Sequence, residues 1–303
     1  MSKFFSPLQQ FRSFYFQNKP KNIEEAIEYF AVFGGMGWSV DTSKSLDELI
    51  EEKVLSNYRY IHGDITKITQ SNRLYHAILT GIATGDRREQ SAFKKGRISR
   101  KEGEDSVDFL VDNDLLEVEK PQVKAVNGDE VSNKLLFTLP FMRFWFSSIS
   151  PYYKGIKDGD YAEVKQQFQN RKEGFSNFIY ERLILALIRE NFHNDPIVQL
   201  GGYWDNSVEI DIVGKTKSGK TIAGSWKFSK SKAKKSELGR LKEKCVHAGL
   251  DVDIFIIFSK GGFSKELKNE KGANLKLFSL KNLNSLVENL TSDDLIENRN
   301  KKY

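Results

Sequence analysis

The segment 208–227 contains the feature that most constrains how this chain can fold. Residues 208–213 alternate in polarity and are rich in β-branched side chains, residues 215–220 are polar with a glycine at 219, and residues 221–226 are again typical of a strand. The sequence therefore predicts two strands joined by a tight turn.

Each of these strands carries two polar side chains at alternate positions. Because side chains two residues apart share a face of a strand, we expect Glu209 and Asp211 to point together, and Ser225 and Lys227 likewise. A carboxylate can hold a divalent metal ion, and a bound metal ion can polarise a phosphodiester. An Asp–Lys ion pair across a hairpin is the competing, purely structural interpretation.

The composition is that of a folded, cytoplasmic protein. A chain of 303 residues suits two or three compact units, and 39% hydrophobic residues suffice for their cores. No stretch approaches the length of an apolar membrane span, and the first residues lack the pattern of a secretory signal. The single cysteine, Cys245, excludes an internal disulfide framework. We expect no membrane partner.

The net charge of +6 is concentrated in the second half of the chain. Residues 1–150 hold 20 Lys and Arg against 21 Asp and Glu, whereas residues 151–303 hold 27 against 20. A basic domain attracts nucleic acid, so we expect DNA as a partner. The residues predicted to contact it are Lys230, Lys232, Lys234 and Lys235, together with Lys94, Lys95 and Arg97. A solvated lysine-rich loop is the alternative for the first group.

The apolar patterns divide the chain into four predicted segments. Residues 1–68 are a helical, lid-like segment, and residues 69–140 have the helices and strand pair of a winged helix, with a turn at Asn127-Gly128. Residues 141–295 alternate helices with strands after the hairpin, which predicts a mixed sheet flanked by helices. Residues 296–303 are a polar tail. The predicted fold class is α/β (α+β).

Two features limit how the first half could contact DNA. The third helix of the winged-helix segment carries exposed acids, among them Glu104, Asp105 and Asp108, which would repel phosphate. A protein-contact or spacer role fits it at least as well. The aromatic stretch 141–146 is predicted to be a buried inter-domain hydrophobic joint rather than a base-stacking platform, since six consecutive residues cannot all face solvent.

Several strings occur in the order found in one known family. They are 29–35, 75–85, 141–146, 203–205, 209–212 and 258–263. With them the chain resembles the C-terminal region of archaeal-type P-loop ATPases, which carry a lid, a winged helix and a PD-(D/E)XK nuclease-like domain of unknown function. The pattern Gly-x-x-x-x-Gly-Lys-Ser/Thr occurs only at 214–221, inside the predicted hairpin and not before a helix, where a phosphate loop would need it. We therefore expect the ATPase domain of that family to be absent, and no ATP as cofactor.

The resemblance implies a restriction endonuclease-like fold and a set of site residues. It implies Asp211 as the nuclease acid, Lys227 as the lysine and Glu181 as a helix glutamate, with Mg²⁺ or Mn²⁺ held by Asp211 and Glu181. The family pattern has an acid where this chain has Ser225, and Glu209 is the candidate replacement.

Three functional hypotheses follow. The first is a DNA-binding protein with an atypical or vestigial nuclease site. The second is an active Mg²⁺-dependent DNA endonuclease, that is, a metal-dependent phosphodiesterase. The third is a protein-interaction module that works with a separate ATPase.

Overall fold

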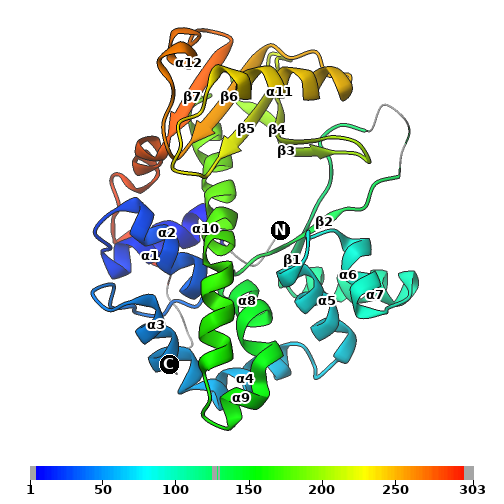
Figure 1. Ribbon diagram of the computed structural model, residues 1–303, viewed down its shortest axis with the longest axis vertical. Helices are drawn as coiled ribbons and strands as arrows, with labels where there is room; N and C mark the ends of the chain where they lie inside the picture. The colour runs from blue at the N-terminus through cyan, green and yellow to red at the C-terminus, as the bar shows by residue number, and fades with distance from the viewer. Residues whose placement is uncertain (1–4, 125–127, 129, 297–303) are drawn as a thin grey trace. The chain divides into compact units, whose positions relative to one another are not determined.

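The computed structural model describes residues 5–124, 128 and 130–296, which pack into two compact units (Figure 1). The helical unit comprises Met1–Val118, Lys134–Ile179 and Asn289–Tyr303, and the sheet unit comprises Glu119–Asn133 and Tyr180–Glu288. The long helix α10, Ala162–Glu190, contributes residues to both. The predicted turn at Asn127 and most of the predicted tail lie outside the described residues.

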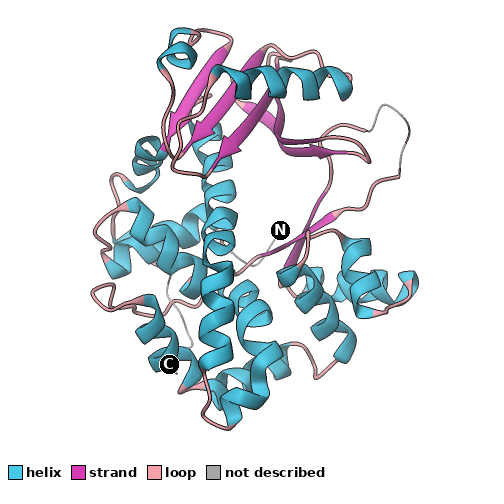
Figure 2. Cartoon of the chain, in the orientation of Figure 1, coloured by secondary structure: helices cyan, strands magenta, loops and turns pink. Residues whose placement is uncertain are grey.

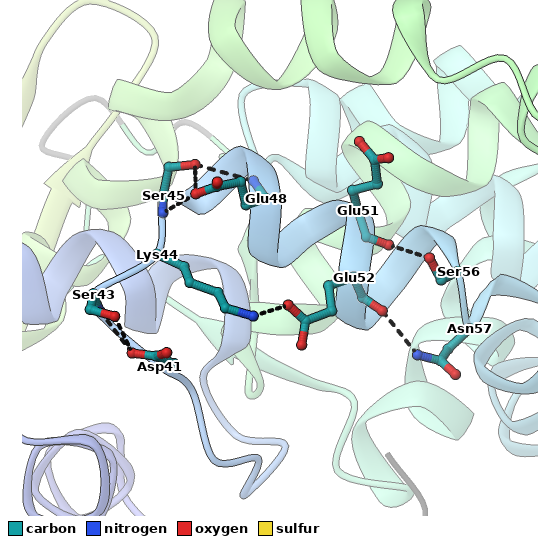
Figure 3. A network of polar contacts seen from close by, with 9 residues as sticks. All are labelled: Asp41, Ser43, Lys44, Ser45, Glu48, Glu51, Glu52, Ser56 and Asn57. Carbon is teal, nitrogen blue, oxygen red and sulfur yellow. Dashed lines mark hydrogen bonds and ion pairs between the residues drawn. The ribbon is translucent and has the colours of Figure 1, made fainter.

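The helical unit begins with helices whose ends are set by polar capping residues. The elements are α1 (Pro7–Asn18), α2 (Ile23–Phe33), α3 (Leu46–Leu49), a π-helical segment (Ile50–Leu55) and α4 (Tyr58–Ile68). Figure 3 shows the polar contacts around α3, where Ser45 and Glu48 satisfy each other's backbone N–H groups in a capping box. Lys44 reaches forward to Glu52 at 2.6 Å. These local bonds explain why a helix begins at Leu46.

Three helices and a strand pair follow in the order expected of a winged helix. They are α5 (Arg73–Thr84), α6 (Glu89–Gly96), α7 (Arg100–Asp112), β1 (Leu116–Glu119) and β2 (Lys134–Phe137). Strands β1 and β2 form a two-stranded sheet. Tyr75 of α5 stacks on Phe109 of α7 with ring centroids 4.5 Å apart, which ties the first helix to the third.

The aromatic stretch 141–146 is buried, as predicted. It forms α8 (Pro140–Phe144) and the start of a π-helical turn (Trp145–Ile149), which leads to α9 (Tyr153–Lys157). Phe141 packs on Trp38, Trp145 stacks on Tyr58, and Phe144 contacts α10. All these contacts lie inside the helical unit, where they join the N-terminal helices to residues 141–168. The burial was predicted, whereas these contacts belong to the core of one unit and not to an inter-domain joint.

The sheet unit is a five-stranded mixed sheet, which confirms the predicted α/β class (Figure 2). Its elements are β3 (Ile197–Trp204), β4 (Glu209–Thr216), β5 (Thr221–Lys227), α11 (Lys235–His247), β6 (Ile254–Ser259), α12 (Lys265–Asn269) and β7 (Leu275–Ser279). The strands lie in sequence order. The first three are antiparallel and the last three are parallel. The predicted hairpin is β4–β5. The chain continues through 3₁₀ turns at Leu280–Val287 and Ser292–Asp294.

Helices cover both faces of this sheet. Leu241 and Cys245 of α11 pack against Ile210 and Ala223 on one face. On the other, Tyr180 of α10 contacts the ring of Phe258, which follows the α11-facing Ile257 by one position and so points the opposite way. No helix among the described residues is long and apolar enough to cross a membrane.

Candidate functional site

A pocket of ≈170 Å³ lies within the sheet unit where β4, β5 and α11 meet. Its polar lining residues are Asp211, Ser225, Lys227, Glu237, Arg240 and Lys244. It therefore brings together two of the four predicted catalytic residues, the serine that replaces the family acid, and three charged side chains of α11.

The end of a strand ladder places Asp211 in this pocket. The antiparallel pairing of β4 with β5 runs from Lys215 opposite Thr221 to Ile212 opposite Gly224. One residue further, the Asp211 carboxylate accepts a hydrogen bond from the backbone N–H of Trp226 at 3.1 Å. A side chain thus takes the place of the next backbone pairing, and the carboxylate is fixed beside β5.

The surroundings of Asp211 shift its ionisation towards neutral pH. Burial is the main cause and raises the pKa of Asp211 to about 6, against the opposing effects of the Trp226 N–H and the Lys244 charge. The negative charges of Glu209 and Glu181 also raise this pKa. Asp211 can therefore exchange a proton within the physiological pH range.

Lys227 pairs with a residue of α11 and not with the neighbouring strand. Its Nζ lies 3.0 Å from Oε1 of Glu237, and Oε2 of Glu237 lies 3.3 Å from Arg240. The interpretation of the hairpin as an Asp211–Lys227 ion pair is wrong for the described structure, because α11 offers Lys227 a carboxylate from the adjacent layer.

Glu181 and Glu209 lie near Asp211 but do not line the pocket. Glu181 is on α10, and Glu209 is the first residue of β4. The carbonyl oxygen of Glu209 accepts a hydrogen bond from Lys244 at 2.9 Å, which links the start of β4 to α11. Both glutamates act on the site through their charge.

The pocket offers few protein ligands for a divalent metal ion. Among the described residues, no three Asp, Glu, His or Cys side chains form a metal-binding group, so an all-protein cage is excluded for that part of the chain. The pocket does offer the carboxylates of Asp211 and Glu237 with the hydroxyl of Ser225. Both oxygens of Glu237, however, already contact Lys227 and Arg240, and Lys244 lines the same pocket. A metal ion would therefore depend on the Asp211 carboxylate, on water and on substrate phosphates for its ligands.

Sequence reasoning missed Glu237, Arg240 and Lys244. Together with Leu241 these residues recur at helical spacing on α11, so they share one face. The available signal for these residues was the helical spacing of charged side chains in the segment that follows Lys227 along the chain. The buried Leu241 identifies the face as the one that packs on the sheet.

The predicted DNA-contacting residues lie in two places. Lys230, Lys232 and Lys234 are exposed in the loop between β5 and α11, and Lys235 pairs with Glu270 at 2.6 Å. In the helical unit, Lys94 and Lys95 end α6 and Arg97 follows it. The Nζ of Lys95 donates to the hydroxyl of Thr84.

The comparisons with known proteins give a partial family match. Residues 145–238 match the DUF234 model, described as archaeal and bacterial proteins of unknown function. This range includes Asp211, Lys227 and Glu237. A search of curated proteins found no match.

Two solved structures are weakly similar. One is a protein of unknown function, AF1548, at 21% identity over 33% of this chain and 56% of that one, with a TM-score of 0.26. The other is VC1899 from Vibrio cholerae, at 13% identity over 73% of this chain and 54% of that one, with a TM-score of 0.27. The chain thus spans about half the length of each. Over residues 145–238, this chain is similar to the archaeal and bacterial proteins of unknown function that DUF234 describes.

Proposed function

We propose that this chain is a DNA-binding protein whose nuclease-like domain has an atypical site, with Ser225 in place of the motif acid. The observation that carries the proposal is the grouping of Lys227, Arg240 and Lys244 around one pocket at the edge of the β4–β5 ladder. Three cations in one concave site attract a phosphate group.

The charges of the pocket favour an anionic ligand over a neutral one. Its three cations face two carboxylates, Asp211 and Glu237. Burial raises the pKa of Asp211 to about 6, so its negative charge is reduced in mildly acidic solution. The exposed Lys230, Lys232 and Lys234 extend the basic surface along the loop that enters α11. A DNA backbone presents a continuous row of phosphates to such a basic surface.

The winged-helix segment has a different role in this proposal. Its third helix, α7, exposes Glu104, Asp105 and Asp108, which repel phosphate. We assign it to protein contact or spacing. The resemblance to the C-terminal region of archaeal-type P-loop ATPases makes a separate ATPase a candidate partner, and the match of residues 145–238 is in keeping with that resemblance.

The second candidate function is an Mg²⁺- or Mn²⁺-dependent DNA endonuclease. It is favoured by one observation, that Asp211 and Lys227 line the same pocket. A bound divalent ion would polarise a phosphodiester. Asp211 would contribute to holding it, and Lys227 would neutralise charge on the phosphate. Metal-dependent cleavage that is lost in both Asp211→Ala and Lys227→Ala would support this candidate, and absence of cleavage by the wild-type protein would contradict it.

The test of DNA binding is fluorescence anisotropy with a labelled duplex in EDTA. We expect binding that weakens steeply as salt rises and a lower affinity for the double variant Arg240→Ala Lys244→Ala. Lys217→Ala Lys220→Ala is the matched control, because it removes the same charge from the exposed β4–β5 turn. Equal affinity of the two double variants would contradict the placement of DNA at the pocket.

A further inference from the structure

A stack of aromatic rings in the sheet unit begins at a residue of the pocket. The ring centroids of Trp226 and Phe228 lie 6.0 Å apart with 20° between the ring planes, and those of Phe228 and Tyr180 lie 5.6 Å apart at 28°. Trp226 also lines the pocket. We propose that the Trp226 ring stacks on an unpaired nucleobase, so that the DNA bound here carries a single-stranded segment. The inference rests on the proposed function, because it names the class of DNA that the same site takes.

The stack runs from the interior of the sheet unit towards its surface. Tyr180 is 1% exposed and packs on Phe258 of the sheet, whereas Trp226 and Phe228 are only half-buried. In the part of the chain that the structure describes, Phe228 is the one ring that stacks on Trp226. Trp226 is therefore the outer end of the series. A ring at the end of a stack can take another flat ring on its remaining face.

The charges around the stack suit a nucleic acid strand. Lys230 and Lys232 are exposed in the loop that follows Phe228, and the Nζ of Lys260 lies 5.3 Å from the centroid of the Tyr180 ring. Together with the three cations of the pocket, these lysines attract the phosphates on either side of a bound base. Proteins that bind single strands combine such a basic surface with aromatic side chains on which the bases stack.

The loop that carries the two exposed lysines is held in place. The N–H of Ala233 donates to the carbonyl oxygen of Gly262 at 2.8 Å, and its carbonyl oxygen accepts from the N–H of Ser264 at 2.9 Å. A Cβ at Gly261 would collide with the carbonyl group of Lys230. The loop after β5 thus lies directly against the loop after β6. A binding surface that is already ordered loses less entropy when its ligand binds.

The pocket and the ring are placed to hold one nucleotide through two different groups. Trp226 directly precedes Lys227 on β5, so a phosphate at the pocket cations has its own base within reach of the indole ring. In a duplex, each base is paired and its faces are covered by its neighbours, so the ring cannot stack on it without unpairing. Duplex DNA would therefore be held through its phosphates alone, and an unpaired strand through phosphates and base.

The experiment compares two labelled oligonucleotides of equal length by fluorescence anisotropy in EDTA, one of thymidine and one abasic. Both carry the same phosphates, and only the first has bases. We expect the full chain to bind the thymidine strand about tenfold more tightly. Trp226→Leu, which keeps an apolar side chain without a flat ring, should bind the two strands alike. Trp226→Phe restores a flat ring and should keep the preference.

Phe255→Leu is the matched control. Phe255 is another half-buried aromatic residue of the sheet, with the Nζ of Lys242 5.5 Å from its ring centroid, but it does not line the pocket. Its variant should prefer the thymidine strand as the wild type does, and thermal unfolding verifies that each variant is folded. A strand carrying 5-iodouracil gives a readout in the wild type that needs no variant, because ultraviolet cross-linking should place the adduct at Trp226.

Each contrary result has a definite meaning. Equal affinity of the wild type for the two strands, binding of neither, an equal loss of preference in the Trp226→Leu and Phe255→Leu variants, or an adduct away from Trp226 would overturn the inference. Duplex binding that depends on Arg240 and Lys244, without a preference for bases, would leave the proposed function in place and overturn this inference only. A preference for bases without duplex binding would have the reverse meaning.

Discussion

Lys227 of β5 lies 3.0 Å from Glu237 of α11, whereas Asp211 on the adjacent strand accepts its hydrogen bond from the Trp226 backbone. Asp211 and Lys227, which lie on the two strands of the hairpin, therefore have different partners. This arrangement brings a carboxylate from α11 to the ammonium group of Lys227.

The Lys227–Glu237 pair should contribute modestly to stability. Both side chains are less than one-third exposed. We expect a double-mutant cycle with Lys227→Met and Glu237→Gln to give a coupling energy of about 1 kcal/mol. The cycle is measured by urea denaturation at low salt. A coupling energy near zero would show that the contact does not order the pocket.

The raised pKa of Asp211 makes stability depend on pH. The folded-state pKa of Asp211 is about 6, above the ordinary value of 3.8 for an aspartic acid, so the native state binds more protons than the unfolded state between these two values. Stability should therefore fall as pH rises through this window, and the penalty is complete above pH 6.

Asp211→Asn tests this effect because the amide oxygen still accepts from the Trp226 N–H. We expect it to stabilise the protein by up to about 3 kcal/mol at alkaline pH, since one pKa unit corresponds to about 1.4 kcal/mol. Below the unfolded-state pKa the gain should vanish. Urea denaturation across this pH range provides the measurement, and a gain that does not depend on pH would contradict the assignment.

A substitution at Gly224 tests the close approach of β5 to β6 beside the pocket. A Cβ at this position would lie 2.8 Å from the carbonyl oxygen of Ile256. We expect Gly224→Ala to destabilise the protein by about 1–3 kcal/mol. Gly239→Ala on α11 is the control, because a Cβ there meets nothing within 4 Å. Removing a helical glycine should stabilise the protein by about 0.5–1 kcal/mol. Thermal unfolding distinguishes the two outcomes.

The aromatic stretch should affect stability and not DNA affinity. Phe144 is fully buried and contacts Phe168 and Phe175 edge-on. Phe144→Ala should lower the free energy of unfolding by about 3–5 kcal/mol. The folded fraction should bind DNA as tightly as wild type. Reduced DNA affinity with unchanged stability would instead support the base-stacking interpretation.

Local patterns predicted much of the sheet unit. Strict alternation in residues 208–213 predicted β4, and the apolar run 251–258 predicted β6, the strand whose two faces are covered by helices. The same alternation placed Glu209 beside Asp211, yet only Asp211 lines the pocket. The β4–β5 ladder ends at Ile212, so strand periodicity does not govern the side chains beyond it.

The role of Glu237 could not be predicted from a strand motif. Its place in the site depends on how α11 packs on β4 and β5, which brings together residues ten positions apart in different layers. A motif search along β5 detects the missing acid at Ser225 but has no information about a carboxylate from the helix above it. The partners of Lys235 and Lys95 could not be predicted from local sequence either, because tertiary packing brings Glu270 to Lys235 and Thr84 to Lys95.

The most direct test of the account is the salt dependence of DNA binding, measured by anisotropy in EDTA for three proteins. Wild type and Lys217→Ala Lys220→Ala should bind alike, with log Kd rising linearly with log salt. Arg240→Ala Lys244→Ala should bind about tenfold more weakly, with a salt slope smaller by about 2, because each lost phosphate contact removes roughly 0.9 from the slope. No binding by the wild-type protein at low salt, or an affinity that does not change with salt, would contradict the central claim.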